Sequence, residues 1–198
     1  MTLPVDSSEL SVDDVAAFTA GRLSAGDDET QRLLDTALTA ARRFCGWHVN
    51  PILTGDTATL DGPGSRILAL PTQKLLTLTS VTEDGAALDV TTLAVSANDN
   101  QEVHVRKTGS SCCYWTHCYS GIQVVMDHGY DNVEAADWRQ AVLSMVDQMA
   151  SGERSDAELV VKRVDDIQYQ WGPVSTDQAV MSVSSVLVDY QIKQVYFL

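Results

Sequence analysis

The sequence is poor in basic residues. It contains 13 lysines and arginines against 27 aspartates and glutamates, which gives a formal net charge of −14 at neutral pH. Proteins that grip DNA use clustered Lys and Arg side chains, which displace the counterions of the phosphates. Here the densest basic groups are only pairs, namely Arg42–Arg43, Arg106–Lys107 and Lys162–Arg163. The composition therefore argues against a DNA-binding protein. We interpret the three basic pairs as solvated or interface charges.

Long hydrophobic runs are also missing. No stretch approaches the roughly 18 consecutive apolar residues of a membrane span. The segment Met1–Leu10 lacks the basic patch and the apolar core of a secretion signal. We therefore expect a protein that is made and kept in a cytosol-like compartment, away from membranes. With 198 residues, 44% of them hydrophobic, the chain is expected to form one compact domain with extensions.

Cysteine is scarce and irregularly spaced. Cys45 stands alone, and Cys112, Cys113 and Cys118 crowd one segment without the spacing of a disulfide framework, so we expect reduced thiols. Together with His117, the crowded segment could supply ligands to one tetrahedral zinc. Adjacent cysteines point in different directions, however, and no second Cys-x-x-Cys pair completes the set. We expect a loop used for packing or contact, with a small zinc-binding module as the alternative, and assign no metal ligand.

The sequence lacks the motifs of common enzyme chemistry. Gly62–Gly64 precedes a predicted strand, and no Gly-Lys-Ser/Thr follows a glycine-rich turn, which excludes the usual phosphate-binding loops. Asp165–Asp166 are neighbours whose side chains point apart, so they form no acid–base couple. His128 is interpreted as a turn residue that ends a strand, although it could orient a water or bind a metal. A Cys–His pair is conceivable, but nothing in the sequence brings one together. We expect no enzyme, no catalytic residue and no cofactor.

The patterns that are present predict three helices. Ser11 has the hydroxyl of a helix N-cap and is followed by acidic residues, so we expect a short helix at 11–21. A second helix at 28–46 ends at Gly46, and a third is expected at 134–150. Both longer helices carry one apolar stripe at helical spacing. In the second, the stripe consists of Leu33, Leu34, Ala37, Leu38, Ala41, Phe44 and Cys45.

Between the second and third helices the pattern changes to short strands. Thr57–Leu60, Ile67–Leu70 and Leu75–Val81 are rich in β-branched or aliphatic residues, and Asp84–Gly85 is a turn signal. We expect antiparallel strands over 57–126. The predicted fold class is α+β and mainly α-helical: a helix bundle with a small antiparallel β-sheet and an extended C-terminal docking tail.

The order of these signals resembles a known family. Ala40–Gly46 closes a capped helix pair, Leu68–Pro71 leads into Ser80–Gly85, and Ile122–Asp131 precedes the acidic helix start at Ala135–Leu143. This order resembles that of the head-to-tail connector proteins of tailed bacteriophages, which are also called adaptor or head-completion proteins. The resemblance implies a connector domain at 1–158 and a C-terminal extension for docking at 159–198.

The resemblance also implies a function. A structural virion protein is expected, forming a ring of about a dozen copies at the phage neck, connecting the head portal to the tail and letting DNA pass. Its partners would be other copies of itself, the portal protein and the next neck or tail-terminator protein. DNA would cross the channel without specific binding, and no membrane would be involved. The expected location is the head–tail neck of the virion, assembled in the host cytoplasm; the alternative is another neck or tail-completion ring protein.

The segment Leu159–Leu198 is expected to reach a partner. Its last part, Val180–Leu198, is strongly apolar, and exposed apolar segments usually mark partner surfaces. The alternative is a tail that packs back on its own domain. The candidate docking residues are Trp171, Tyr190, Tyr196, Phe197 and Leu198.

Overall fold

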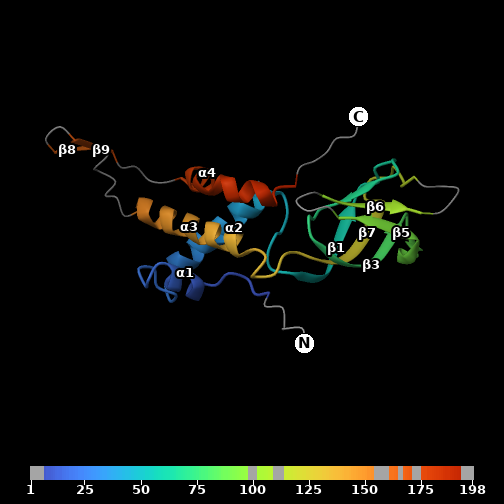
Figure 1. The fold of residues 1–198 in the computed structure, drawn as a ribbon, viewed down its shortest axis with the longest axis horizontal. Helices are drawn as coiled ribbons and strands as arrows, with labels where there is room; N and C mark the ends of the chain where they lie inside the picture. Colours follow the sequence, from blue (N-terminus) through green and yellow to red (C-terminus); the bar gives the residue numbers. More distant parts are fainter. Residues whose placement is uncertain are drawn as a thin grey trace. The chain divides into compact units, whose positions relative to one another are not determined.

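The chain folds into two compact units that are interleaved along the sequence (Figure 1). The computed structural model describes residues 7–97, 102–108, 114–153, 161–164, 167–170 and 175–192, without side chains for 152–153 and 161–170. The helical unit contains Glu9–Cys45 and Ala136–Asp189. The β unit contains Met1–Ser8, Gly46–Ala135 and Tyr190–Leu198. The chain therefore crosses from one unit to the other after Ser8, Cys45, Ala135 and Asp189.

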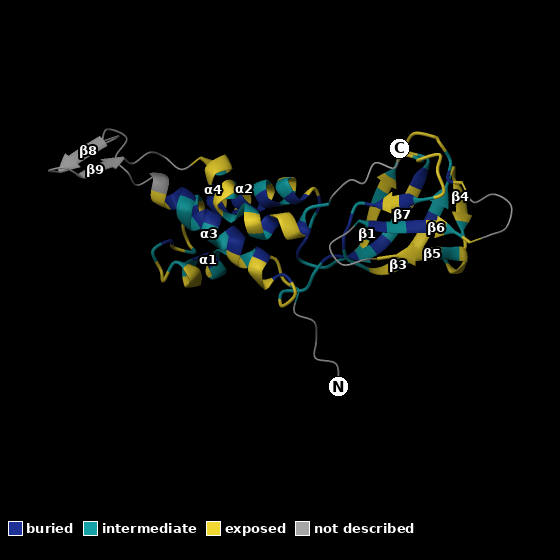
Figure 2. Ribbon diagram, turned by 45° about the horizontal axis from the view of Figure 1, so that its top comes forward, coloured by how far each residue is buried: buried dark blue, intermediate teal, exposed yellow. Residues whose placement is uncertain are grey.

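In the described part of the chain, four helices build the helical unit: α1 (Val12–Phe18), α2 (Asp28–Cys45), α3 (Ala136–Glu153) and α4 (Thr176–Leu187). The first three lie where the sequence predicts helices. Their apolar stripes face inward (Figure 2), and α2 buries all of its predicted stripe except Phe44. The unit also contains a hairpin of β8 (Val161–Val164) and β9 (Ile167–Gln170).

Reciprocal hydrogen bonds fix the starts of α1 and α4. The backbone N–H of Asp14 donates to Ser11 Oγ at 3.3 Å, and the Ser11 N–H donates to Asp14 Oδ2 at 2.9 Å. Ser175 and Gln178 repeat this arrangement at the start of α4, with distances of 3.3 and 3.1 Å. Each pair satisfies backbone donors that a helix start otherwise leaves without partners. The expected cap at Ser11 is confirmed.

Helix α4 corrects the expectation of an extended C-terminal tail. It packs on α2 and α3, with Ala179 and Leu187 fully buried. Cys45 Sγ lies 3.7 Å from the Leu187 carbonyl oxygen, so the C-terminal ends of α2 and α4 meet. Apolar residues at helical spacing bury more surface against neighbouring helices than an extended chain would. For Thr176–Leu187, the alternative of a segment packed on its own domain is therefore the correct one.

Two antiparallel sheets build the β unit, and together with four helices they make the fold α+β without a helical majority. The larger sheet has the order β1–β7–β3–β4, and the smaller has the order β2–β6–β5. A short 3-10 turn, η1 (Val90–Thr92), precedes β5. The strands are β1 (Leu53–Leu60), β2 (Leu68–Leu70), β3 (Leu75–Glu83), β4 (Ala86–Leu88), β5 (Leu93–Ser96), β6 (Val103–Lys107) and β7 (Ile122–His128).

Strand β7 is the centre of the larger sheet. It pairs with β1 on one side and β3 on the other, so that Val125 lies opposite both Thr57 and Ser80. Its side chains alternate: Ile122, Val124 and Met126 are fully buried, as expected for a strand with one face on the core. These residues join side chains of the smaller sheet in one hydrophobic core, completed by Leu68, Leu70, Val81, Val103, Val105 and Trp115.

The segment before β7 runs beside the turn that follows β1. The N–H of Gly62 donates to the Cys118 carbonyl at 2.9 Å, and the N–H of Gly64 donates to the Thr116 carbonyl at 2.9 Å. The two backbones approach so closely that a Cβ atom on Gly62 would lie 2.2 Å from the Thr116 oxygen. Only glycine fits this position without a displacement of the backbone.

We predict that Gly62→Ala destabilises the protein, because the added methyl group forces these two backbones apart. The free energy of unfolding should fall by about 1–3 kcal/mol, the usual cost of overpacking. Urea unfolding followed by circular dichroism measures it. Gly26→Ala is the control, since its nearest neighbour would be Ser24 Oγ at 3.9 Å. Equal stability of the two variants would contradict the close approach.

The Cys45 thiol should make stability depend on alkaline pH. Burial raises its pKa from 9.0 to about 12. The pKa is higher in the folded state than in the unfolded state, so stabilisation is complete below about pH 9 and is lost as the pH rises toward 12. Urea unfolding at about pH 8 and about pH 10.5 should show a larger decrease for the natural chain than for Cys45→Ala. Equal decreases would refute the role of this thiol.

Candidate docking surfaces

Most of the predicted docking residues fall outside the described part of the chain. Trp171, Tyr196, Phe197 and Leu198 belong to segments 171–174 and 193–198, and their role stays a prediction. Tyr190 is described, and the β unit encloses it with only 8% of its surface exposed. Its hydroxyl donates to the Glu134 carbonyl at 3.2 Å. In this structure Tyr190 therefore packs inside its own unit and offers little surface to a partner, which differs from the expectation.

Tyr190 belongs to an aromatic cluster formed by Trp47, His128, Tyr130 and Tyr190. The Tyr190 ring meets Tyr130 edge-on, with centroids 5.4 Å apart, and Tyr130 meets Trp47 at 5.7 Å. Trp47 Nε1 donates to the Tyr190 carbonyl at 2.7 Å. Aromatic pairs of this geometry add roughly 0.5–1.5 kcal/mol beyond the area that they bury. The cluster therefore ties the chain after α4 to the chain after α2.

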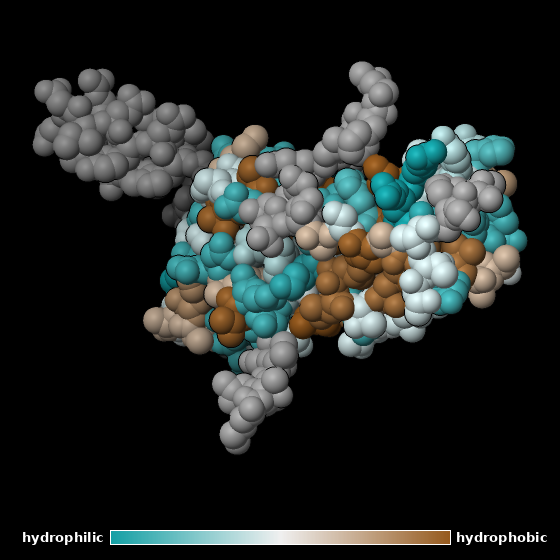
Figure 3. All heavy atoms as spheres, turned by 45° about the vertical axis from the view of Figure 1, so that its right-hand side comes forward, coloured by the Kyte–Doolittle hydropathy of each residue, from teal (hydrophilic) through white to brown (hydrophobic). Residues whose placement is uncertain are grey.

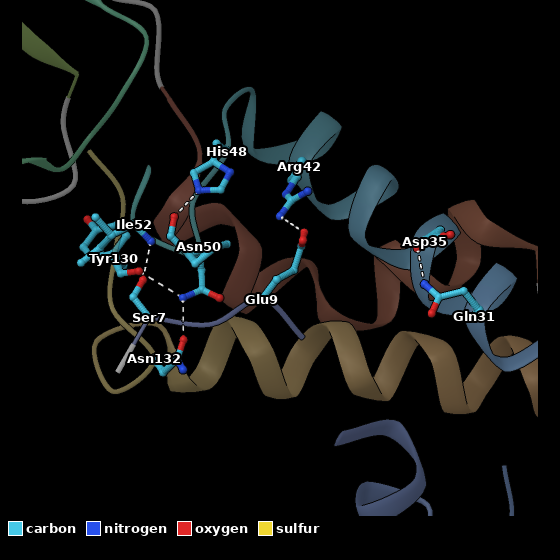
Figure 4. Close-up of polar contacts among 11 residues, drawn as sticks. Ser7, Glu9, Gln31, Asp35, Arg42, His48, Asn50, Ile52, Tyr130 and Asn132 are labelled. Carbon is cyan, nitrogen blue, oxygen red and sulfur yellow. Dashed lines mark hydrogen bonds and ion pairs between the residues drawn. The ribbon is translucent and has the colours of Figure 1, made fainter. Parts of the chain in front are cut away.

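A polar network around Asn50 continues this connection (Figure 4). The Asn50 amide donates to the Tyr130 carbonyl at 3.1 Å and to Asn132 Oδ1 at 3.2 Å. Asn132 in turn donates to Ser8 Oγ at 3.1 Å. Asn50 is almost completely buried, and buried polar groups are costly unless they are hydrogen-bonded. The network therefore fixes the paths of three chain segments within the β unit.

His128 ends β7, as predicted, but it is buried in the cluster and is not an exposed turn residue. Its Nε2 lies 3.1 Å from Asp56 Oδ2, and its ring stacks on Trp47 with centroids 6.3 Å apart. Nδ1 has no hydrogen-bond partner within the described ranges. His48 meets the ring edge-on at 5.8 Å. These contacts give His128 a packing role in the β unit.

The β unit presents an exposed aromatic loop at 114–121. Tyr119 is 91% exposed, and Tyr114 is also exposed, with the Arg66 guanidinium 5.2 Å from its ring centre. Lys107 Nζ anchors the start of the loop, because it donates to the Tyr114 carbonyl at 2.9 Å and lies 4.7 Å from the Trp115 ring centre. Glu83 Oε2 holds Lys107 Nζ in place at 2.5 Å. Interfaces are enriched in Tyr and Arg, so a loop that holds such residues in fixed positions is a candidate contact surface.

The helical unit presents a groove between α2 and α4, with a volume of about 810 Å³. Apolar side chains form part of its lining, and Met181 in α4 is 72% exposed. Figure 3 shows hydrophobic residues, drawn in brown, gathered in patches on one face of the molecule. The groove is lined by Arg32, Asp35, Thr36, Thr39, Ala40, Arg43 and Phe44 from α2 and by Thr176, Asp177, Val180 and Met181 from α4.

Among the charged residues that line the groove, Arg43 and Asp177 have no ion-pair or hydrogen-bond partner within the described residues. Arg32 pairs with Glu29, and Asp35 accepts a hydrogen bond from Gln31 at 2.8 Å. Within the described residues, the side chains of Arg43 and Asp177 form neither an ion pair nor a hydrogen bond. Both are exposed. Asp177 lies at the start of α4 and Arg43 near the end of α2, and the C-terminal ends of the two helices meet. The groove therefore has an acidic end, an apolar middle and a basic end.

Neither a metal centre nor a membrane span is found among the described residues. No three His, Cys, Asp or Glu side chains of these ranges come together as metal ligands. Cys118 is exposed, and Cys112 and Cys113 lie outside the described part. No described helix is sufficiently long and apolar to cross a membrane.

The surfaces found here were only partly visible in the sequence. Tyr114 lies in the Cys-rich segment that was expected to serve packing or contact, whereas Tyr119 directly follows that segment. The groove was missed because α4 was taken as extended, although Ser175–Gln178 carries the Ser-x-x-Gln signature of a helix start. The Asn50 network has no local sequence signature, since it joins residues that are distant in the chain.

Comparison with known proteins identifies the fold. No protein-family model matches the sequence, and no curated protein matches it. Two solved chains are similar over 98% of both lengths. One lies in the neck of a native gene transfer agent (GTA) particle computed with C12 symmetry, with a TM-score of 0.54 and 11% identity. The other lies in the neck of an empty GTA particle computed with C6 symmetry, with a TM-score of 0.52 and 15% identity. The chain thus shares, over its whole length, the fold of neck proteins from a phage-like particle.

Proposed function

We propose that this chain is a structural protein of the neck of a tailed-phage-like particle, where it forms a ring that connects the head portal to the tail. The observation that carries the proposal is the match over 98% of both chains to a neck protein of a GTA particle. A match of this extent includes both units and their interleaved connections. The order of sequence signals, which resembles that of head-to-tail connectors, supports the same role independently of the coordinates.

The symmetry of the similar particle supports a copy number. The neck of the native GTA particle was computed with C12 symmetry, which suggests a homo-oligomer of about 12 copies. In a closed ring each subunit contacts its two neighbours through different surfaces. The chain offers separate candidate surfaces for such contacts, namely the α2–α4 groove and the 114–121 loop. Its further partners would be the portal and the next neck or tail-terminator protein.

The charge of the chain agrees with a passage for DNA. Each copy carries a formal net charge of −14, and a ring of copies multiplies it. Acidic walls repel phosphate and keep DNA from binding as it passes. A structural role, without catalysis or a cofactor, is sufficient for such a channel. In this proposal the protein resides in the head–tail neck after assembly in the host cytoplasm.

The docking role of the C-terminal segments belongs to the same proposal. Trp171, Tyr196, Phe197 and Leu198 are large apolar residues of the kind that anchor interfaces. Because α4 is part of the helical unit, the docking segment proper would be 193–198 together with the region around Trp171. A deletion that tests docking must therefore leave Thr176–Leu187 in place.

We predict that the full chain binds the portal of its own particle. Size exclusion coupled to light scattering should show it co-eluting with the portal ring, with a mass gain equal to about 12 copies per portal. Contacts repeated around a ring act together, so the complex should persist at concentrations where one contact alone would dissociate.

A chain shortened after Ile192 is the matched variant, because it keeps all four helices and both sheets. Its portal binding should weaken while its circular dichroism stays unchanged. Absence of binding between the full chain and the portal would contradict the connector role. This result would favour another neck or tail-completion position, which binding to tail proteins would reveal.

A further inference from the structure

The side chains that line the α2–α4 groove restrict the kind of segment that can bind in it. Its middle is lined by the apolar side chains of Ala40, Val180 and Met181. The exposed Asp177 carboxylate lies at one end and the exposed Arg43 guanidinium at the other, and neither has a partner among the residues that the structure describes. A matching segment would carry a cation at one end, followed by apolar and aromatic side chains that stack on Arg43.

One segment of the chain has this composition. Residues 193–198 read Lys-Gln-Val-Tyr-Phe-Leu, with a single cation followed by Val195, Tyr196, Phe197 and Leu198. Lys193 complements Asp177, and the aromatic rings complement the Arg43 and Phe44 end. No acidic residue interrupts the segment, although the chain as a whole has twice as many acidic residues as basic ones.

The length of the groove also agrees with the length of segment 193–198. On α2 the lining runs from Arg32 to Phe44, 12 positions at about 1.5 Å each, or roughly 18 Å. Six extended residues span about 20 Å. The segment therefore fits the groove in one pass, with Lys193 and Leu198 near opposite ends.

We propose that the α2–α4 groove of one copy receives residues 193–198 of the neighbouring copy. The inference rests on the proposed ring, because a ring closes through heterologous contacts in which one subunit donates a surface and the next receives it. Segment 193–198 is the donor and the groove is the acceptor. In a closed ring, the segment of every copy is bound by one neighbour, and its groove is filled by the segment of the other neighbour. The exposed Met181 and the unpaired Arg43 and Asp177 are then covered in the assembly.

Site-specific photocrosslinking tests the contact in the full chain. A photoreactive phenylalanine at position 197 is activated in a mixture of ¹⁴N- and ¹⁵N-labelled protein, over a concentration series that includes the portal-bound ring. Mass spectrometry then identifies the crosslinked peptides. Crosslinks to 39–44 or 180–181 that join one label to the other are expected. Same-label crosslinks alone, crosslinks to other surfaces, or no crosslink at any concentration overturn the proposal.

A charge exchange tests the orientation. Asp177→Lys and Lys193→Glu should each lower the mixed-label crosslink yield by about fivefold, because each variant places two like charges opposite one another at an exposed end of the groove. The combination of both should restore most of it, because the pair is re-formed with reversed signs. A general weakening of α4 would not be rescued in this way. Asp189→Lys makes the same charge change outside the groove and should leave the yield unchanged; a loss there, or no rescue in the double variant, overturns the orientation.

These outcomes separate the inference from the proposed function. Normal rings on the portal with crosslinks elsewhere refute the groove contact and leave the neck role intact. Failure to form a ring or to bind the portal refutes both.

Discussion

The aromatic and amide cluster of the β unit is the constraint on which the interleaved chain depends. Trp47 donates to the Tyr190 carbonyl at 2.7 Å, and the Tyr130 N–H donates to the Val49 carbonyl at 2.8 Å. Asn50 joins Tyr130 and Asn132. These bonds hold together the segment that follows α2, the one that precedes α3 and the one that follows α4. Loss of the cluster would release three of the four places where the chain passes between units.

This arrangement would allow the C-terminal region to serve two purposes in the proposed ring. Up to Tyr190 it is bound into the fold, first as α4 and then as part of the aromatic cluster. Gln191 is still fixed, because Gln73 Nε2 donates to its carbonyl at 2.8 Å. Ile192 and then residues 193–198 come after this anchor. A subunit built in this way can keep its own two units intact while a short apolar segment is offered to a neighbour, which suits a ring assembled from copies of one chain.

The sequence predicted the elements with local signals and missed those that depend on distant partners. The stripe from Leu33 to Cys45 and the acidic cap after Ser11 specify α2 and α1 through neighbouring residues alone. The mixture of Val and Ser residues in Thr176–Leu187 has weaker helix propensity, and its packing on α2 and α3 decides its structure. Tyr190 was assigned to a partner surface because its burial depends on Tyr130, 60 positions away. The groove could not be predicted at all without α4.

The proposed ring at the neck is tested most directly by electron microscopy of the particle that carries this chain. A compact tag inserted after Gly26, an exposed turn residue outside both candidate surfaces, marks each copy, and averaging of the head–tail junction locates it. The account predicts a ring of tag density at the neck, between portal and tail, with about twelvefold symmetry like that of the similar native GTA neck. Tag density in the tail or on the capsid, or particles that lack the chain, would contradict it.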